Sequence, residues 1–151
     1  MLNCRILALA IGLATTSATS QELDPSVQRE ANLGTAAFEC ASLAATAGGL
    51  LDSEANRLAE VGYSATLAAM ESLRNMLSQD DSPGLGSMGP FMSGRTADFL
   101  AGMSFAEANR KIRGYLDSES PYELGSDFDN WQALRGIIAE NEFNRRNCSL
   151  L

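Results

Sequence analysis

Apolar residues recur at steps of three and four along much of the chain, which is the spacing of one helix face. Asp24 before Pro25 is typical of a helix start, and Gly48 with Gly49 is typical of a helix end. Between them runs a seam of mostly small residues: Leu33, Ala37, Cys40, Ala44 and Ala47. We therefore predict a first helix that other helices approach closely. Any part of the seam around Ala37, Ala44 and Ala47 that the chain leaves uncovered is a candidate dimer face.

A second helix is predicted from Asp52, as its N-cap, to about Ser78. Its inner side comprises Leu58, Ala65, Ala69, Leu73, Met76 and Leu77. Ala55 and Gly62 are expected close-approach points. Because glycine weakens a helix by about 1 kcal/mol relative to alanine, Gly62 indicates a bend or a tight crossing.

The C-terminal half is predicted to hold two or three further helices. A Gly/Pro-rich loop, 79–94, precedes a short helix over 95–101 that Gly102 ends. Ser104 and Glu107 match a capping box that starts the next helix. Its inward residues are Phe105, Ala108, Ile112, Tyr115 and Leu116. After a turn at 117–126, a last helix over 127–146 has an apolar set of Phe128, Trp131, Leu134, Ile137 and Ile138.

No stretch shows the two-residue alternation of a strand. The fold class is therefore all-α, as a small irregular bundle of four to five helices.

The first twenty residues have the pattern of a secretory signal peptide. Arg5 precedes an apolar run over 6–13, and small residues follow up to Ser20. The run is shorter than the about 20 residues needed to span a bilayer. We predict a signal peptide over 1–20 and a single all-helical domain over 21–151. The mature protein is then exported without membrane insertion, most simply to the periplasm, with the cell exterior as the alternative.

Removal of the signal peptide would leave two cysteines, Cys40 and Cys148. Exported compartments are oxidising, so these two are expected to form one disulfide. It would join the last residues of the chain to the first mature helix. The alternatives are weaker, because a reactive thiol lacks a histidine to activate it and two cysteines do not make a zinc site.

The composition is acidic, with 19 Asp and Glu against 11 Lys and Arg and a net charge of −8. This charge argues against nucleic acid and anionic lipid as partners, since both require a cationic surface. An unknown protein partner with a basic surface fits better. The acidity equally serves simply to keep an exported protein soluble.

The loop contains the sequence GLGSMG over 84–89, which matches the dinucleotide-binding pattern G-x-G-x-x-G. That motif requires a strand before it and a helix after it. Here Asp80 and Asp81 precede the glycines and Pro90 follows, so we reject a dinucleotide site. Its apolar residues form a candidate contact loop, or else pack onto the domain: Met88, Phe91 and Met92.

The chain contains no histidine, which excludes Ser-His-Asp and Cys-His catalysis. Its one lysine, Lys111, lies four residues after Glu107 and is expected to form a helical ion pair with it. The carboxylate pairs Asp127/Asp129 and Glu140/Glu142 are each two residues apart, so neither pair shares a helix face. We predict no catalytic residue, no cofactor and no metal.

The sequence as a whole favours a small exported protein that acts by binding another protein, as an inhibitor, immunity protein or adaptor does. A homodimer is a further option. The alternatives are an acid-stress periplasmic chaperone and a glycan-cleaving enzyme with two carboxylates.

Overall fold

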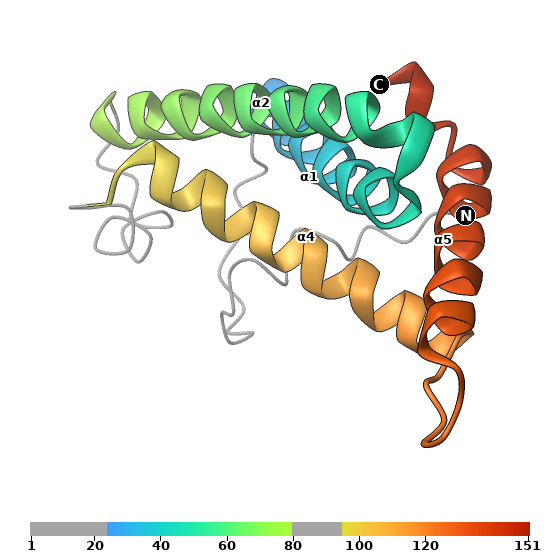
Figure 1. The fold of residues 1–151 in the computed structure, drawn as a ribbon. Helices are drawn as coiled ribbons and strands as arrows, with labels where there is room; N and C mark the ends of the chain where they lie inside the picture. The colour runs from blue at the N-terminus through green and yellow to red at the C-terminus, as the bar shows by residue number, and fades with distance from the viewer. Residues whose placement is uncertain (1–23, 80–94) are drawn as a thin grey trace.

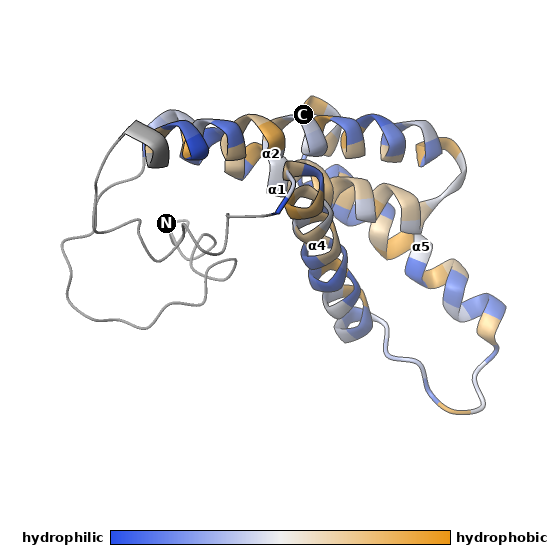
Figure 2. Ribbon diagram, turned by 90° about the vertical axis from the view of Figure 1, so that its left-hand side faces the viewer, coloured by the Kyte–Doolittle hydropathy of each residue, from blue (hydrophilic) through white to orange (hydrophobic). Residues whose placement is uncertain are grey.

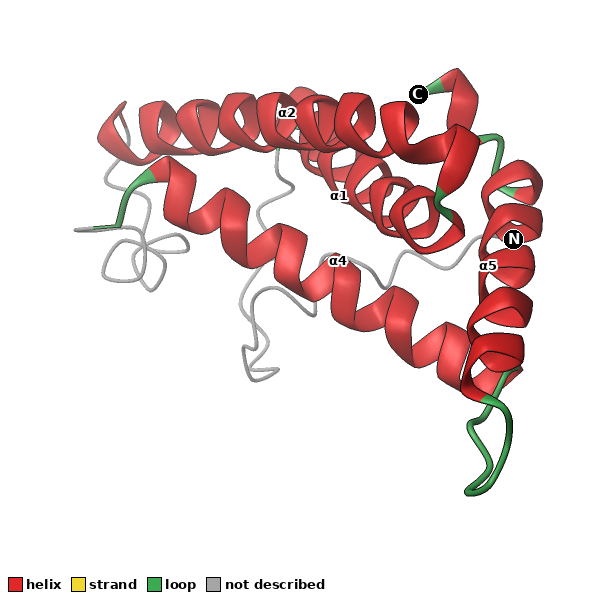
Figure 3. Cartoon of the chain, viewed as in Figure 1, coloured by secondary structure: helices red, strands yellow, loops and turns green. Residues whose placement is uncertain are grey.

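The computed structural model describes residues 24–79 and 95–151, and the described chain is helical with no strand (Figures 1 and 3). The α-helices within these ranges are α1 (Pro25–Ala47), α2 (Asp52–Gln79), α4 (Ala97–Glu119) and α5 (Phe128–Arg145). Two 3₁₀ turns, Gly49–Leu51 and Cys148–Leu150, follow α1 and α5. The predicted all-α fold class is confirmed.

Helix α1 is the centre of the bundle, and α2, α4 and α5 all pack against it. A tight turn joins α1 to α2, so the two helices form an antiparallel hairpin (Figure 1). Gly48 and Gly49 make this turn with φ of +66° and +60°, a conformation that glycine adopts without strain. Asp52 is the first residue of α2 and has helical angles, so its predicted role as N-cap is wrong.

The hairpin is closely packed because glycines face the partner helix. A Cβ placed on Gly62 would lie 2.5 Å from the Phe38 ring, and one on Gly34 would lie 2.5 Å from the Thr66 hydroxyl. The prediction that Gly62 marks a close approach is therefore confirmed, and Gly34 is a second such point.

The core forms around the seam of α1. Ala37 and Ala44 are fully buried and Ala47 is half-buried against the core, so the predicted small-residue seam is covered by the chain's own helices. It is not an open dimer face. The other helices and the C-terminal turn contribute Leu58, Ile112, Leu116, Ala139, Phe143 and Cys148.

The predicted break between two helices near residue 102 is wrong. Thr96 caps α4 by accepting a hydrogen bond from the Phe99 amide, and the helix then continues through Gly102. The Ser104 hydroxyl donates to the Leu100 carbonyl within the helix, so Ser104 does not cap a new one. Both positions lie inside the single helix Ala97–Glu119, and the capping box with Glu107 is not formed.

Several predictions fall on residues outside the described ranges. They are the signal peptide over 1–20 and the loop over 80–94 with its GLGSMG sequence and contact candidates Met88, Phe91 and Met92. Among the described helices, none is both long and apolar enough to cross a membrane.

Candidate functional site

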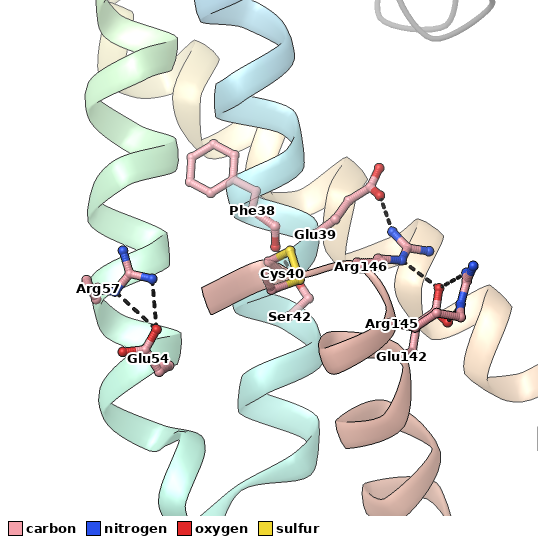
Figure 4. Close-up of a disulfide and its surroundings, with 10 residues drawn as sticks. Phe38, Glu39, Cys40, Ser42, Glu54, Arg57, Glu142, Arg145 and Arg146 are labelled. Carbon is pink, nitrogen blue, oxygen red and sulfur yellow. Dashed lines mark hydrogen bonds and ion pairs between the residues drawn. A yellow bond between two sulfur atoms is a disulfide. The ribbon is translucent and has the colours of Figure 1, made fainter. Parts of the chain in front are cut away.

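The C-terminal half of α5 is fastened to the centre of the bundle by the predicted disulfide. Cys40 on α1 and Cys148 after α5 are bonded with their Cα atoms 5.6 Å apart, and both are buried (Figure 4). Ala139 and Phe143 of α5 are buried in the same core cluster as the two cysteines. A disulfide of this kind fits an oxidising, exported compartment.

A network of charged side chains lies beside the disulfide (Figure 4). Glu142 on α5 accepts hydrogen bonds from the Arg145 and Arg146 guanidinium groups, each at 2.6 Å. Arg146 also donates to Glu39 on α1 at 2.7 Å, and Lys111 on α4 donates to the other Glu39 oxygen at 2.6 Å. This ionic clasp, made of Glu39, Lys111, Glu142, Arg145 and Arg146, joins three helices.

Glu142 is the most deeply buried charge of the clasp, with a side chain only 3% exposed. Hydrogen bonds from Arg145 stabilise its ionised form most, and Arg146 adds to them, which lowers its pKa from 4.5 to about 2 although burial acts in the opposite direction. Glu142 is therefore ionised at neutral pH. Every member of the clasp has a charged partner.

The other end of α5 is an aromatic cluster at the α4–α5 turn. Trp131 donates its indole N–H to the Ser120 carbonyl at 2.9 Å. Tyr122 and Phe128 lie against the Trp131 ring with centroid distances of 5.3 and 5.5 Å. Arg135 covers the ring at 5.2 Å. These contacts fix the turn, but they leave Tyr122 and Phe128 about half exposed.

Two apolar residues of α5 point away from the bundle. Leu134 and Ile137 are 50% and 56% exposed, and their three-residue spacing places them on one face. Ala139 and Phe143 occupy the buried face. Figure 2 shows hydrophobic residues alternating with hydrophilic ones along α5 and in the turn before it. Of the predicted apolar set of this helix, Phe128, Leu134 and Ile137 are about half exposed.

The chain segment that leads into α5 is rich in carboxylates. Between Arg113 and Arg135 the chain carries five acidic residues and no basic one: Asp117, Glu119, Glu123, Asp127 and Asp129. All five are exposed, and within the described ranges only Asp117 forms an ion pair, with Arg135. Asp127 caps α5 by accepting from the backbone amides of residues 129 and 130. The remaining carboxylates face solvent.

We call this region, defined by Tyr122, Leu124, Phe128, Leu134 and Ile137 with the surrounding carboxylates, the α5 surface. It includes exposed apolar side chains and carboxylates, of which only Asp117 forms an ion pair among the described residues. Sequence reasoning missed it because α5 carries apolar residues on two faces, and the interval pattern alone does not say which face packs. The available signal for this surface was the three-residue spacing of Leu134 and Ile137, which places them together on one face of the helix.

Both carboxylate pairs considered as catalytic candidates lie on α5 or at its N-cap. Asp127 and Asp129 lie at the start of α5, and Glu140 is exposed whereas Glu142 is buried in the clasp. Lys111 pairs with Glu39 rather than with Glu107, which instead binds Arg110. Glu142 forms an ion pair with Arg146, four residues later on the same helix end. Within residues 24–79 and 95–151, no group of acidic residues and cysteines is arranged to hold a metal ion.

Comparisons with known proteins add no family to this description. No protein-family model matches the chain, and neither the curated proteins nor the solved structures show a significant similarity to it. What the chain does must therefore be argued from its own surface.

Proposed function

We propose that this protein is an exported, most simply periplasmic, binding protein whose α5 surface contacts a basic protein partner. The observation that carries the proposal is the two-faced helix α5. One face is buried against α1, while the other presents Leu134 and Ile137 to solvent. Exposed apolar groups rimmed by polar ones are typical of protein-protein contact sites.

The charge around the surface defines the partner's chemistry. Glu119, Glu123 and Asp129 have no ion-pair partner within the described chain, so their field is not neutralised locally. A partner with lysine or arginine around an apolar centre would complement both features. Charge complementarity of this kind mainly accelerates association and excludes acidic partners, whereas the apolar centre supplies affinity.

Inhibition or capping of the partner is the activity that such a surface would support. The fixed aromatic cluster, with Trp131 held by Ser120 and Arg135, gives the surface a defined shape before binding. A surface that is ordered beforehand loses less conformational entropy when it binds.

Site-specific photocrosslinking tests the proposal. A photoreactive phenylalanine analogue would replace Ile137 in the full chain, and the exported fraction would be irradiated and analysed by mass spectrometry. We expect one basic protein to be crosslinked in stoichiometric amounts, and its association with the purified protein to weaken steeply as salt rises. The matched control places the same analogue at Glu71, which is exposed on α2.

Two results would contradict the proposal. One is the same set of crosslinked proteins from positions 137 and 71, which would indicate nonspecific capture. The other is a partner that is acidic or whose binding does not depend on salt.

A further inference from the structure

A groove lies between α1, α4 and α5, and its charged side chains are mostly positive, in contrast to the acidic α5 surface. This open groove of about 630 Å³ is lined by Ala45 and Thr46 of α1, Arg113 and Asp117 of α4, and Trp131, Gln132 and Arg135 of α5. Its volume lies in the range of small-molecule sites. The groove holds two guanidinium groups and one carboxylate, in a chain whose net charge is −8.

The two arginines differ in a way that suits an anionic ligand. Arg135 is fixed, since its side chain is only 14% exposed, pairs with Asp117 and covers the Trp131 ring. Arg113 is exposed and forms no ion pair with any described residue. A fixed cation and a free one on adjacent helices provide one oriented donor and one that adjusts to the ligand.

We infer that this groove binds a small carboxylate ligand, held by Arg113 and Arg135 beside Trp131 and Gln132. A planar guanidinium binds a carboxylate through two parallel N–H···O hydrogen bonds, which gives specificity in geometry as well as charge. The Gln132 amide adds both a donor and an acceptor for a hydroxyl or carbonyl group. Asp117 limits the affinity, because the ligand competes with it for Arg135.

The groove also contains its own reporter. Trp131 is the single tryptophan of the chain, so intrinsic fluorescence observes this location alone. Citrate is a suitable probe, with three carboxylates and a size that the groove accommodates. Calorimetry and fluorescence would be followed during citrate titration of the full chain, with sodium chloride adjusted to keep the ionic strength constant.

We expect saturable citrate binding that Arg113→Ala weakens about tenfold or more, since one charge-assisted contact is lost. Arg113 is exposed, so folding is expected to be unchanged, and circular dichroism would confirm this. The matched control is Arg29→Ala, an exposed arginine on α1 that forms no ion pair with a described residue and lies outside the groove. Asp117→Asn is expected to strengthen binding, because it removes the competing carboxylate.

The inference fails if citrate shows no saturable binding by calorimetry, or if Arg29→Ala reduces binding as much as Arg113→Ala does. Equal affinity for inorganic phosphate would also overturn it, since the groove would then discriminate only charge. The groove shares Asp117, Trp131 and Arg135 with the neighbourhood of the α5 surface. The two proposals fail separately, because this test rests on Arg113 and the partner of the α5 surface is tested by crosslinking at Ile137.

Discussion

The two halves of α5 belong to one helix, but they are attached to the bundle by different interactions. The C-terminal half is held by a disulfide, a buried core face and the ionic clasp around Glu142. The N-terminal half, with the α4–α5 turn, holds itself together through Trp131 and leaves Leu134 and Ile137 in solvent. The interactions that stabilise the helix against the bundle are therefore concentrated at one end, and exposed apolar side chains are found at the other.

The largest effect on stability is expected at the C-terminal half of α5, from removal of the disulfide. It links residues 108 positions apart, so the double substitution of Cys40 and Cys148 by alanine is expected to lower the free energy of unfolding by about 2–4 kcal/mol. Urea denaturation with and without a reductant measures this. A wild-type protein whose stability is unchanged by complete reduction would contradict the role assigned to the disulfide.

Glu142→Gln is expected to have the next largest effect. Glutamine keeps the size of the side chain but loses the charge that Arg145 and Arg146 bind. Arg145 is exposed and Arg146 still reaches Glu39, so the loss of unfolding free energy is expected to be about 2–3 kcal/mol rather than more. Glu140→Gln, on the exposed side of the same helix, serves as the control and is expected to change stability by less than about 0.5 kcal/mol.

The same carboxylate predicts how stability depends on pH. Its pKa is lowered from 4.5 to about 2 in the folded protein. The stabilisation is therefore fully present above pH 4.5 and is lost as the pH falls towards 2, a change of roughly 3 kcal/mol. Urea titrations of the wild type and Glu142→Gln between pH 7 and 2 are expected to converge over this interval, and a constant difference would refute the assignment.

This pH interval also bears on the alternative of an acid-stress chaperone. Near-ultraviolet circular dichroism at pH 3, within the interval over which this stabilisation is lost, reports whether tertiary packing survives. Loss of that signal with suppression of client aggregation would support the chaperone hypothesis. A retained signal would favour the binding protein, because the α5 surface would then stay ordered.

Trp131→Phe tests whether the N-terminal half of α5 and the turn before it open independently of the C-terminal half. Phenylalanine keeps an aromatic ring but loses the hydrogen bond to the Ser120 carbonyl and part of the interaction with Arg135. We expect a loss of about 1–2 kcal/mol. In hydrogen exchange, the amides of residues 122–131 are expected to exchange faster while those of 139–145 stay protected. Equal acceleration at both ends would show that the two halves open together.

The sequence was sufficient to predict those features that neighbouring residues or the composition determine. The ends of α1 follow from Asp24, Pro25 and the paired glycines, and the disulfide follows from the cysteine count and the expected compartment. The same local reasoning failed at Gly102, because an exposed helix tolerates a glycine when the turns on either side are stable.

The clasp and the α5 surface could not be predicted because both depend on tertiary contacts. Glu39 and Arg146 are 107 residues apart, and nothing in the sequence near Lys111 indicates that it binds Glu39 instead of Glu107. Likewise α5 carries two apolar stripes, and only the position of α1 decides which of them is buried. The sequence lists the residues of both stripes as one apolar set and does not separate them.

The smallest effect on stability is expected where the effect on function is largest. Leu134→Ser with Ile137→Ser changes two side chains that are half exposed, so the free energy of unfolding is expected to shift by no more than about 0.5 kcal/mol. Binding of the crosslinked partner, measured by calorimetry, is expected to weaken at least about tenfold, because truncating apolar anchors at the centre of a contact costs about 1–2 kcal/mol or more. Ala139→Ser, on the buried face of the same helix, is expected to give the reverse pattern: a clear loss of stability through burial of a hydroxyl, and unchanged affinity once folding is accounted for. If the outward variant were the unstable one, the two halves of α5 would share the task of folding, and the assignment of its outer face to a partner would be wrong.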